Sequence, residues 1–147
     1  MIVKDLFLKL VIRNNMRLMN RIACVIIVLG ISFSSNAQDL VKGKKIYETR
    51  CLVCHQADGG GVPNMNAPLD GSTNLVGNNI ARLVRIVKGG YNEKIALDGY
   101  YYNNVMTPNP DFKDEDIANV LSYVRNSWGN KASKITVAQV KAALHKK

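Results

Sequence analysis

Apolar residues recur at helical spacing in two stretches of the second half of the chain. Positions i, i+3, i+4 and i+7 share one face of a helix. The sets with this spacing are Ile80, Leu83, Val84 and Val87, and Ile117, Val120, Leu121 and Val124. We therefore expect two amphipathic helices, the first ended by Gly89-Gly90 and the second stopped by Gly129. Lys113 is a poor cap for the second helix, which leaves Asp111 as an alternative cap with a slightly earlier helix start.

Two further helices are predicted, one before and one after these stretches. Residues 39–50 are expected to be helical, with Asp39 able to cap the start. Near the C-terminus, Thr136 and Gln139 have the spacing of a capping box, which predicts a short helix through Leu144.

Turn residues separate the predicted helices. The segment 59–63 reads Gly-Gly-Gly-Val-Pro and is expected to be a loop. Segments 93–97 and 100–103 flank Asp98-Gly99, a pair that favours a tight hairpin turn. We expect a short two-stranded ribbon there, so the chain belongs to the all-α class with one small hairpin.

The first 37 residues have the pattern of an export signal. A basic stretch leads into the apolar run 22–33, and small residues follow at the positions that matter for cleavage. We predict a secretory signal peptide cleaved after Ala37, a periplasmic location, and one domain over residues 38–147. A retained membrane anchor is the alternative, but 12 largely apolar residues fall short of the roughly 20 that a spanning helix needs.

Charge and cysteine content change once the signal is removed. The 147-residue chain has 20 basic and 11 acidic side chains, a formal net charge of +9. The signal takes five of the basic and one of the acidic residues, which leaves +5. A mildly basic surface favours association with an acidic partner. Solvated lysines that only keep an exported protein soluble explain the positive charge equally well. No basic run is interleaved with stacking aromatics, so nucleic acid is not an expected partner.

The candidate chemistry lies in residues 51–55, Cys-Leu-Val-Cys-His, which have the C-x-x-C-H spacing of c-type haem attachment. The sulfur atoms of Cys51 and Cys54 can each add to one vinyl group of the porphyrin, and His55 can bind its iron. C-x-x-C also occurs in thioredoxin-like redox motifs and in zinc sites. A zinc site needs four ligands, but beyond the motif the domain offers only His145 as a further cysteine or histidine. A thioredoxin-like site needs strands around the motif, where we expect helices. We therefore predict one covalent haem c, which also supplies apolar surface to a domain without other cysteines.

A haem iron that only carries electrons needs a second axial ligand. Beyond the motif, the domain offers Met65, Met106 and His145. Met65 is only ten residues from His55, and His145 lies in the C-terminal tail. Met106 is 51 residues from His55 and is followed by Thr107-Pro108, where proline stiffens the loop. The residues favour Met106, with the other two as alternatives.

These features resemble the class I cytochromes c over nearly all of residues 38–135. The stretches that carry the resemblance are Gly43 and Tyr47 before the motif, Gly61-Val62-Pro63 after it, Pro68-Leu69, Gly71-Ser72, Val105-Met106-Thr107-Pro108, and Asp114 to Ile117 running into Tyr123 to Asn130. The resemblance implies a small cytochrome c fold of about four to five helices around one covalent haem, with a short β-hairpin before the distal methionine. Residues 131–147 are then a C-terminal extension with a short helix.

The resemblance also implies roles for individual residues. His55 would be the proximal iron ligand, Met106 the distal ligand, and the Pro68 carbonyl the acceptor of a hydrogen bond from His55 Nδ1. The family often has proline directly after the distal methionine. Here Thr107 intervenes before Pro108, so we expect a less rigid ligand loop.

A helix crossing is implied by the same resemblance. Gly43 and Tyr47 of the first helix would pack across Val120 and Tyr123 of the helix that ends the family pattern. A glycine at such a crossing lets two backbones approach closely.

The expected function is single-electron transfer by iron, without enzymatic conversion of a small-molecule substrate. Expected partners are redox proteins, such as a periplasmic or membrane-bound oxidoreductase or a terminal oxidase of a respiratory chain. A peripheral position at the membrane is compatible with this function. Two alternatives stay open. If Met106 were labile or absent as a ligand, the haem would act as a small-ligand sensor or peroxidase, and the domain is also compatible with a fixed electron-transfer subunit of a larger oxidoreductase.

Overall fold

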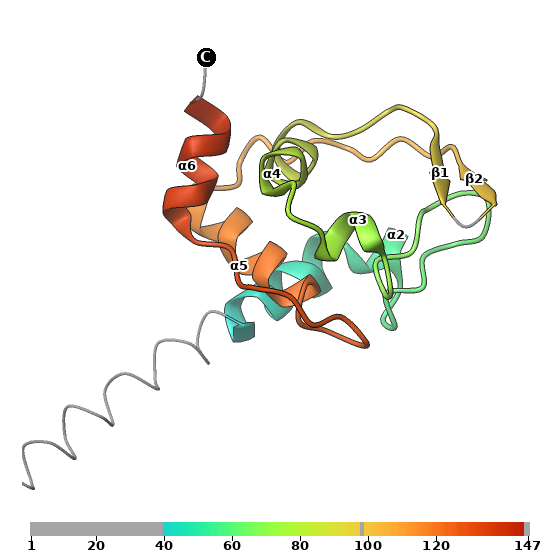
Figure 1. Cartoon of the computed structure of the whole chain (residues 1–147), viewed down its shortest axis with the longest axis horizontal. Helices are drawn as coiled ribbons and strands as arrows, with labels where there is room; N and C mark the ends of the chain where they lie inside the picture. Colours follow the sequence, from blue (N-terminus) through green and yellow to red (C-terminus); the bar gives the residue numbers. More distant parts are fainter. Residues whose placement is uncertain (1–39, 98, 146–147) are drawn as a thin grey trace, which may run out of the picture. The chain divides into compact units, whose positions relative to one another are not determined.

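The computed structural model describes residues 40–97 and 99–145 (Figure 1). The predicted signal peptide and the Asp39 cap lie outside these residues, so both stay predictions. None of the described helices has the length and apolar character needed to cross a membrane.

Helices dominate the described part of the chain, with one small antiparallel sheet (Figure 1). Residues 40–50 form the first helix. The elements that follow are α2 (Leu52–His55), α3 (Thr73–Val76), α4 (Ile80–Gly89), β1 (Ile95–Leu97), β2 (Tyr100–Tyr102), α5 (Asp114–Val124) and α6 (Val137–His145). The four longer helices and the hairpin confirm the predictions. The four-residue helix α3 was not predicted.

The two ends of α5 differ from the predictions. The helix begins at Asp114, and the backbone N–H of Lys113 donates to Asp116 Oδ2 at 2.9 Å. Asp111 therefore does not cap it. The helix ends at Val124 rather than at Gly129, and Arg125 is its C-cap.

The first helix crosses α5 at a glycine, as the resemblance implied. A Cβ on Gly43 would lie 2.1 Å from the carbonyl oxygen of Asn119 and 2.7 Å from Tyr123 Cβ. The rings of Tyr47 and Tyr123 are 5.6 Å apart between centroids, and Trp128 lies 5.4 Å from Tyr47. Only glycine allows the two backbones to come this close, so Gly43 is required at this crossing.

The C-terminal extension is part of the hydrophobic core. Helix α6 packs against α4 and α5, and Val140 is fully buried. The predicted capping box is confirmed, since Gln139 N–H donates to Thr136 Oγ1 at 3.2 Å and Thr136 N–H donates to Gln139 Oε1 at 2.8 Å. Residues far beyond the helix crossing thus hold α4 in place.

Candidate functional site

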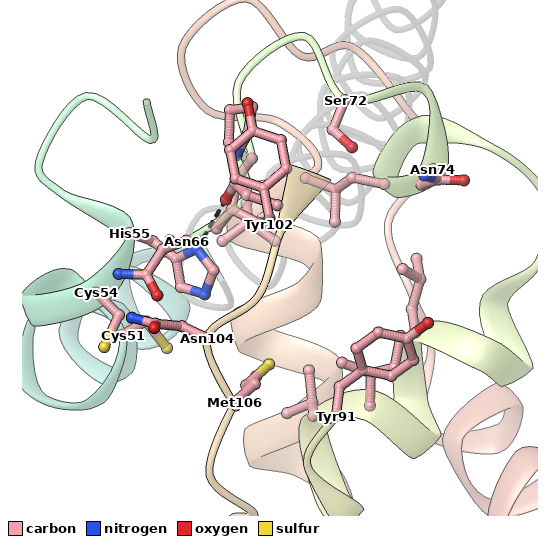
Figure 2. Close-up of a pocket in the computed structure, with 18 of the residues that line it drawn as sticks. Cys51, Cys54, His55, Asn66, Ser72, Asn74, Tyr91, Tyr102, Asn104 and Met106 are labelled. Atoms are coloured by element: carbon pink, nitrogen blue, oxygen red, sulfur yellow. Dashed lines mark hydrogen bonds between the residues drawn. The ribbon is translucent and has the colours of Figure 1, made fainter. Parts of the chain in front are cut away.

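A cavity of about 230 Å³ lies between the motif, α4 and the segment that follows the hairpin (Figure 2). All five predicted site residues line this cavity: Cys51, Cys54, His55, Pro68 and Met106. Most of the other lining residues are apolar. They include Leu75, Leu83, Ile86, Val87, Leu97, Val120, Leu121 and Val124. The fold therefore brings thiols, an imidazole and a thioether together around one apolar space.

Helical geometry explains the spacing of the motif. The backbone N–H of Cys51 donates to the Tyr47 carbonyl at 2.9 Å, and that of His55 donates to the Cys51 carbonyl at 2.9 Å. Positions i, i+3 and i+4 of such a turn share one face, so both cysteines and His55 line the cavity. Val53, between them, is 80 % exposed. One helical turn thus supplies three reactive groups to one wall.

The imidazole of His55 is held by a backbone carbonyl. Its Nδ1 lies 3.3 Å from the carbonyl oxygen of Ala67. Because a carbonyl only accepts, Nδ1 carries the proton and Nε2 keeps its lone pair. Burial lowers the pKa of His55, which favours the neutral ring that binds metals.

The carbonyl that accepts the hydrogen bond from His55 is therefore that of Ala67 and not that of Pro68. The expected acceptor was wrong by one residue. The backbone N–H of Leu69 donates to the Gly59 carbonyl at 2.7 Å, and Gly61 N–H donates to the His55 carbonyl at 3.2 Å. These bonds fold the loop so that Ala67 presents its carbonyl to the ring. Pro68 still lines the cavity.

Neither motif cysteine is paired in a disulfide. Cys54 is exposed, whereas Cys51 is partly buried. Burial raises the pKa of the Cys51 thiol to about 11. Figure 2 shows both sulfur atoms near the His55 ring. They are therefore available for covalent attachment of a group that enters the cavity.

Met106 is fixed by the end of α4. Its backbone forms two hydrogen bonds with Tyr91, Tyr91 N–H to the Met106 carbonyl at 2.9 Å and Met106 N–H to the Tyr91 carbonyl at 2.8 Å. Gly90 has a φ of +78°, and a Cβ there would lie 2.5 Å from the Met106 carbonyl oxygen. Glycine is thus required where α4 meets the ligand loop.

An ion pair restrains the loop after Met106. The guanidinium of Arg50 donates to both carboxylate oxygens of Asp111 at 2.8 and 2.9 Å. This bond raises the pKa of Arg50 and lowers that of Asp111. The backbone N–H of Asn109 also donates to the Lys88 carbonyl at 3.2 Å. The Arg50–Asp111 pair was not predicted, because its partners are 61 residues apart and leave no local signal.

The two alternative ligands are placed differently. Met65 lines the cavity but is 48 % exposed. His145, the last residue of α6, is exposed and is not among the lining residues. The fold therefore offers two thioethers to the cavity and leaves the second histidine outside it.

A cation also lines the cavity. The Arg82 guanidinium lies 5.2 Å from the centroid of the Tyr91 ring and donates to Tyr91 Oη at 3.1 Å. Tyr91 in turn donates to Glu93 Oε2 at 3.1 Å. A guanidinium at this position suits a carboxylate group on a bound cofactor.

The donor set fits a haem c: two thiols for its vinyl groups, an imidazole and a thioether for its iron, and an apolar lining for its ring. No cluster of three or more His, Cys, Asp or Glu residues that could hold a bare metal ion occurs within residues 40–97 and 99–145.

Comparisons with known proteins agree with this geometry. The model of the family described as Cytochrome c matches residues 40–128. The chain is 33 % identical over 109 residues to the alcohol dehydrogenase (quinone), cytochrome c subunit, of Gluconacetobacter polyoxogenes, a match that covers 68 % of this chain and 22 % of that protein. It is 35 % identical over 91 residues to cytochrome c-552 of Thermus thermophilus, covering 60 % of this chain and 69 % of that protein. The chain thus spans only a small part of the dehydrogenase subunit.

Proposed function

Since the chain belongs to the cytochrome c family, with a covalent haem c and electron transfer as its function, we propose that it is an exported single-electron carrier with His55 and Met106 as iron ligands. The haem, when bound, supplies an iron that alternates between the ferric and ferrous states. One observation carries the proposal: the His55 imidazole and the Met106 thioether line the same apolar cavity as the two motif cysteines.

The residues around the cavity each have a task in this function. Cys51 and Cys54 tether the cofactor. The Ala67 carbonyl orients the His55 ring so that Nε2 is free to bind iron, and such an acceptor also raises the basicity of the ligand. The Tyr91 backbone holds Met106, and a methionine ligand raises the reduction potential. The apolar lining excludes water and disfavours the more highly charged oxidation state.

Location and partners follow from the predicted signal peptide and the relatives. We propose the periplasm as the location and redox proteins as the partners, such as a periplasmic or membrane-bound oxidoreductase or a terminal oxidase. The protein would bind and transform no small-molecule substrate. Its relatives include cytochromes c, which supports a carrier rather than an enzyme.

The test uses the mature protein, produced in a host with haem-attachment machinery. Spectra of oxidised and reduced wild type, Met106→Ala and the matched control Met65→Ala would be compared. We expect covalent haem in all three and a weak long-wavelength band of methionine-bound ferric haem that only Met106→Ala loses. If wild type lacks this band and its ferrous form readily binds carbon monoxide, the iron is open, and the sensor or peroxidase alternative replaces the carrier.

A fixed electron-transfer subunit is the second candidate. It is favoured by the similarity to the cytochrome c subunit of a quinone alcohol dehydrogenase. Purification of the tagged full chain from membranes of its native host separates the two candidates. A stable complex with an oxidoreductase would support the subunit, whereas a soluble monomer would support the free carrier.

A further inference from the structure

Arg125 is a buried charge that lies behind the cavity wall. Its side chain is 1 % exposed and is not among the lining residues. The guanidinium donates to neutral oxygens, namely the carbonyls of Leu75, Gly77 (3.0 Å) and Ser133 (3.0 Å). It forms no ion pair within the part of the chain that the structure describes. Burial lowers the pKa of Arg125, but a guanidinium stays protonated in proteins, so the charge is present, and no carboxylate of the described residues lies within ion-pair distance of it.

The carbonyl partners connect this charge to the cavity. Leu75, whose carbonyl accepts from Arg125 Nη1, is itself a lining residue. Val124, which directly precedes Arg125, is another. The guanidinium is therefore separated from the cavity by a single layer of residues, which are apolar at these two positions.

The C-terminal extension covers the charge. Ser133 accepts from Arg125 with its carbonyl and, at 3.4 Å, with its hydroxyl. The Arg125 carbonyl accepts from Ala132 N–H at 3.1 Å. The Ser122 hydroxyl fixes the same segment by accepting from Ile135 N–H at 2.9 Å. The family match ends at residue 128, so this cover is built from residues beyond it.

We propose that Arg125 is a fixed positive charge that raises the reduction potential of the iron bound in the cavity, and that residues 129–145 keep this charge out of water. The inference rests on the proposed electron-transfer function. A nearby cation disfavours the ferric state, which has one more positive charge than the ferrous state. This effect is several times larger at an effective dielectric constant of about 20 than in water at about 80.

The first test compares reduction potentials of the mature haem-loaded protein. Arg125→Met removes the charge and keeps an unbranched aliphatic side chain, whereas Arg125→Lys keeps the charge and loses the planar guanidinium group. Arg85→Met, at an exposed position of α4, is the control. We expect Arg125→Met to have a lower potential than wild type, with Arg125→Lys close to wild type. The shift should persist at high salt, because a buried charge is screened weakly. Equal shifts in the two Arg125 variants would show a packing effect and overturn the inference.

A second pair of variants keeps Arg125 and tests whether the iron senses charge at this position, even if Arg125→Met fails to fold. Ser133→Asp puts an acid beside Arg125, and Ser133→Asn is its neutral match. We expect a lower potential for Ser133→Asp than for Ser133→Asn. Equal potentials in this pair would contradict the inference.

Haem content and the methionine-ligand band are read from each spectrum before its potential is measured. A wild type without covalent haem or without this band would refute the proposed function. Haem-loaded, methionine-ligated variants with unchanged potentials would refute only the role of Arg125.

Discussion

The crossing at Gly43 makes a quantitative prediction about stability. Replacing Gly43 with alanine adds a Cβ that would lie 2.1 Å from the Asn119 carbonyl oxygen and 2.7 Å from Tyr123 Cβ. The nearest atom belongs to the backbone of α5 and cannot rotate away. The first helix must therefore move outward, which disturbs the packing on both sides of the crossing.

The magnitude follows from two opposing effects. Alanine is favoured over glycine inside a helix by about 1 kcal/mol. Overpacking a filled site costs about 1–3 kcal/mol, and occasionally more. A contact with backbone belongs at or above the upper end of that range, so we expect Gly43→Ala to lower the free energy of unfolding by about 2 kcal/mol or more.

Gly89→Ala is the matched control. Gly89 ends α4, and a Cβ there would meet no atom within 4 Å. This variant should be as stable as wild type or more stable, by up to about 1 kcal/mol. Urea unfolding of the haem-loaded proteins measures both changes. A Gly43→Ala variant as stable as Gly89→Ala would refute the close crossing.

Three further predictions concern the ligand loop, the motif and the extension. Asp111→Asn should destabilise the protein above about pH 4. Because pairing with Arg50 lowers the pKa of Asp111 in the folded state, the difference from wild type should vanish as pH falls through that lowered pKa, measured by urea unfolding across pH. Tyr47→Phe removes the 2.6 Å bond to the Gln56 carbonyl and should cost about 1–2 kcal/mol in the same assay. Val140→Ala, at a fully buried position, should cost about 2 kcal/mol in thermal or urea unfolding.

Each of these predictions has an outcome that contradicts it. A pH-independent difference for Asp111→Asn would mean that the ion pair does not restrain the loop. Unchanged stability of Tyr47→Phe would show that the bond to Gln56 makes no net contribution. A tolerated Val140→Ala would mean that α6 does not pack on the core.

Local signals in the sequence predicted most of the fold. The i, i+3, i+4, i+7 spacing located α4 and α5, Asp98-Gly99 located the hairpin, and the Thr136–Gln139 pair located α6. These signals act within a few residues, so they can be recognised in the sequence without knowledge of distant contacts. The C-x-x-C-H spacing is local in the same sense, because one helical turn is enough to bring Cys51, Cys54 and His55 to one face.

Features that depend on distant partners were not predictable. Ala67 rather than Pro68 faces His55 because the Gly59 carbonyl, which accepts hydrogen bonds from the N–H groups of Leu69 and Asp70, sets the path of the loop. The Arg50–Asp111 pair and the burial of Arg125 require segments that meet only after folding.

A redox titration of the mature, haem-loaded protein is the decisive experiment. Iron bound by His55 and Met106 should exchange single electrons and offer no open position. We predict one reversible one-electron step, with the methionine-ligand band in the oxidised form and no binding of carbon monoxide by the reduced form. A reduced form that binds carbon monoxide, or a titration that does not fit a one-electron step, would contradict the account.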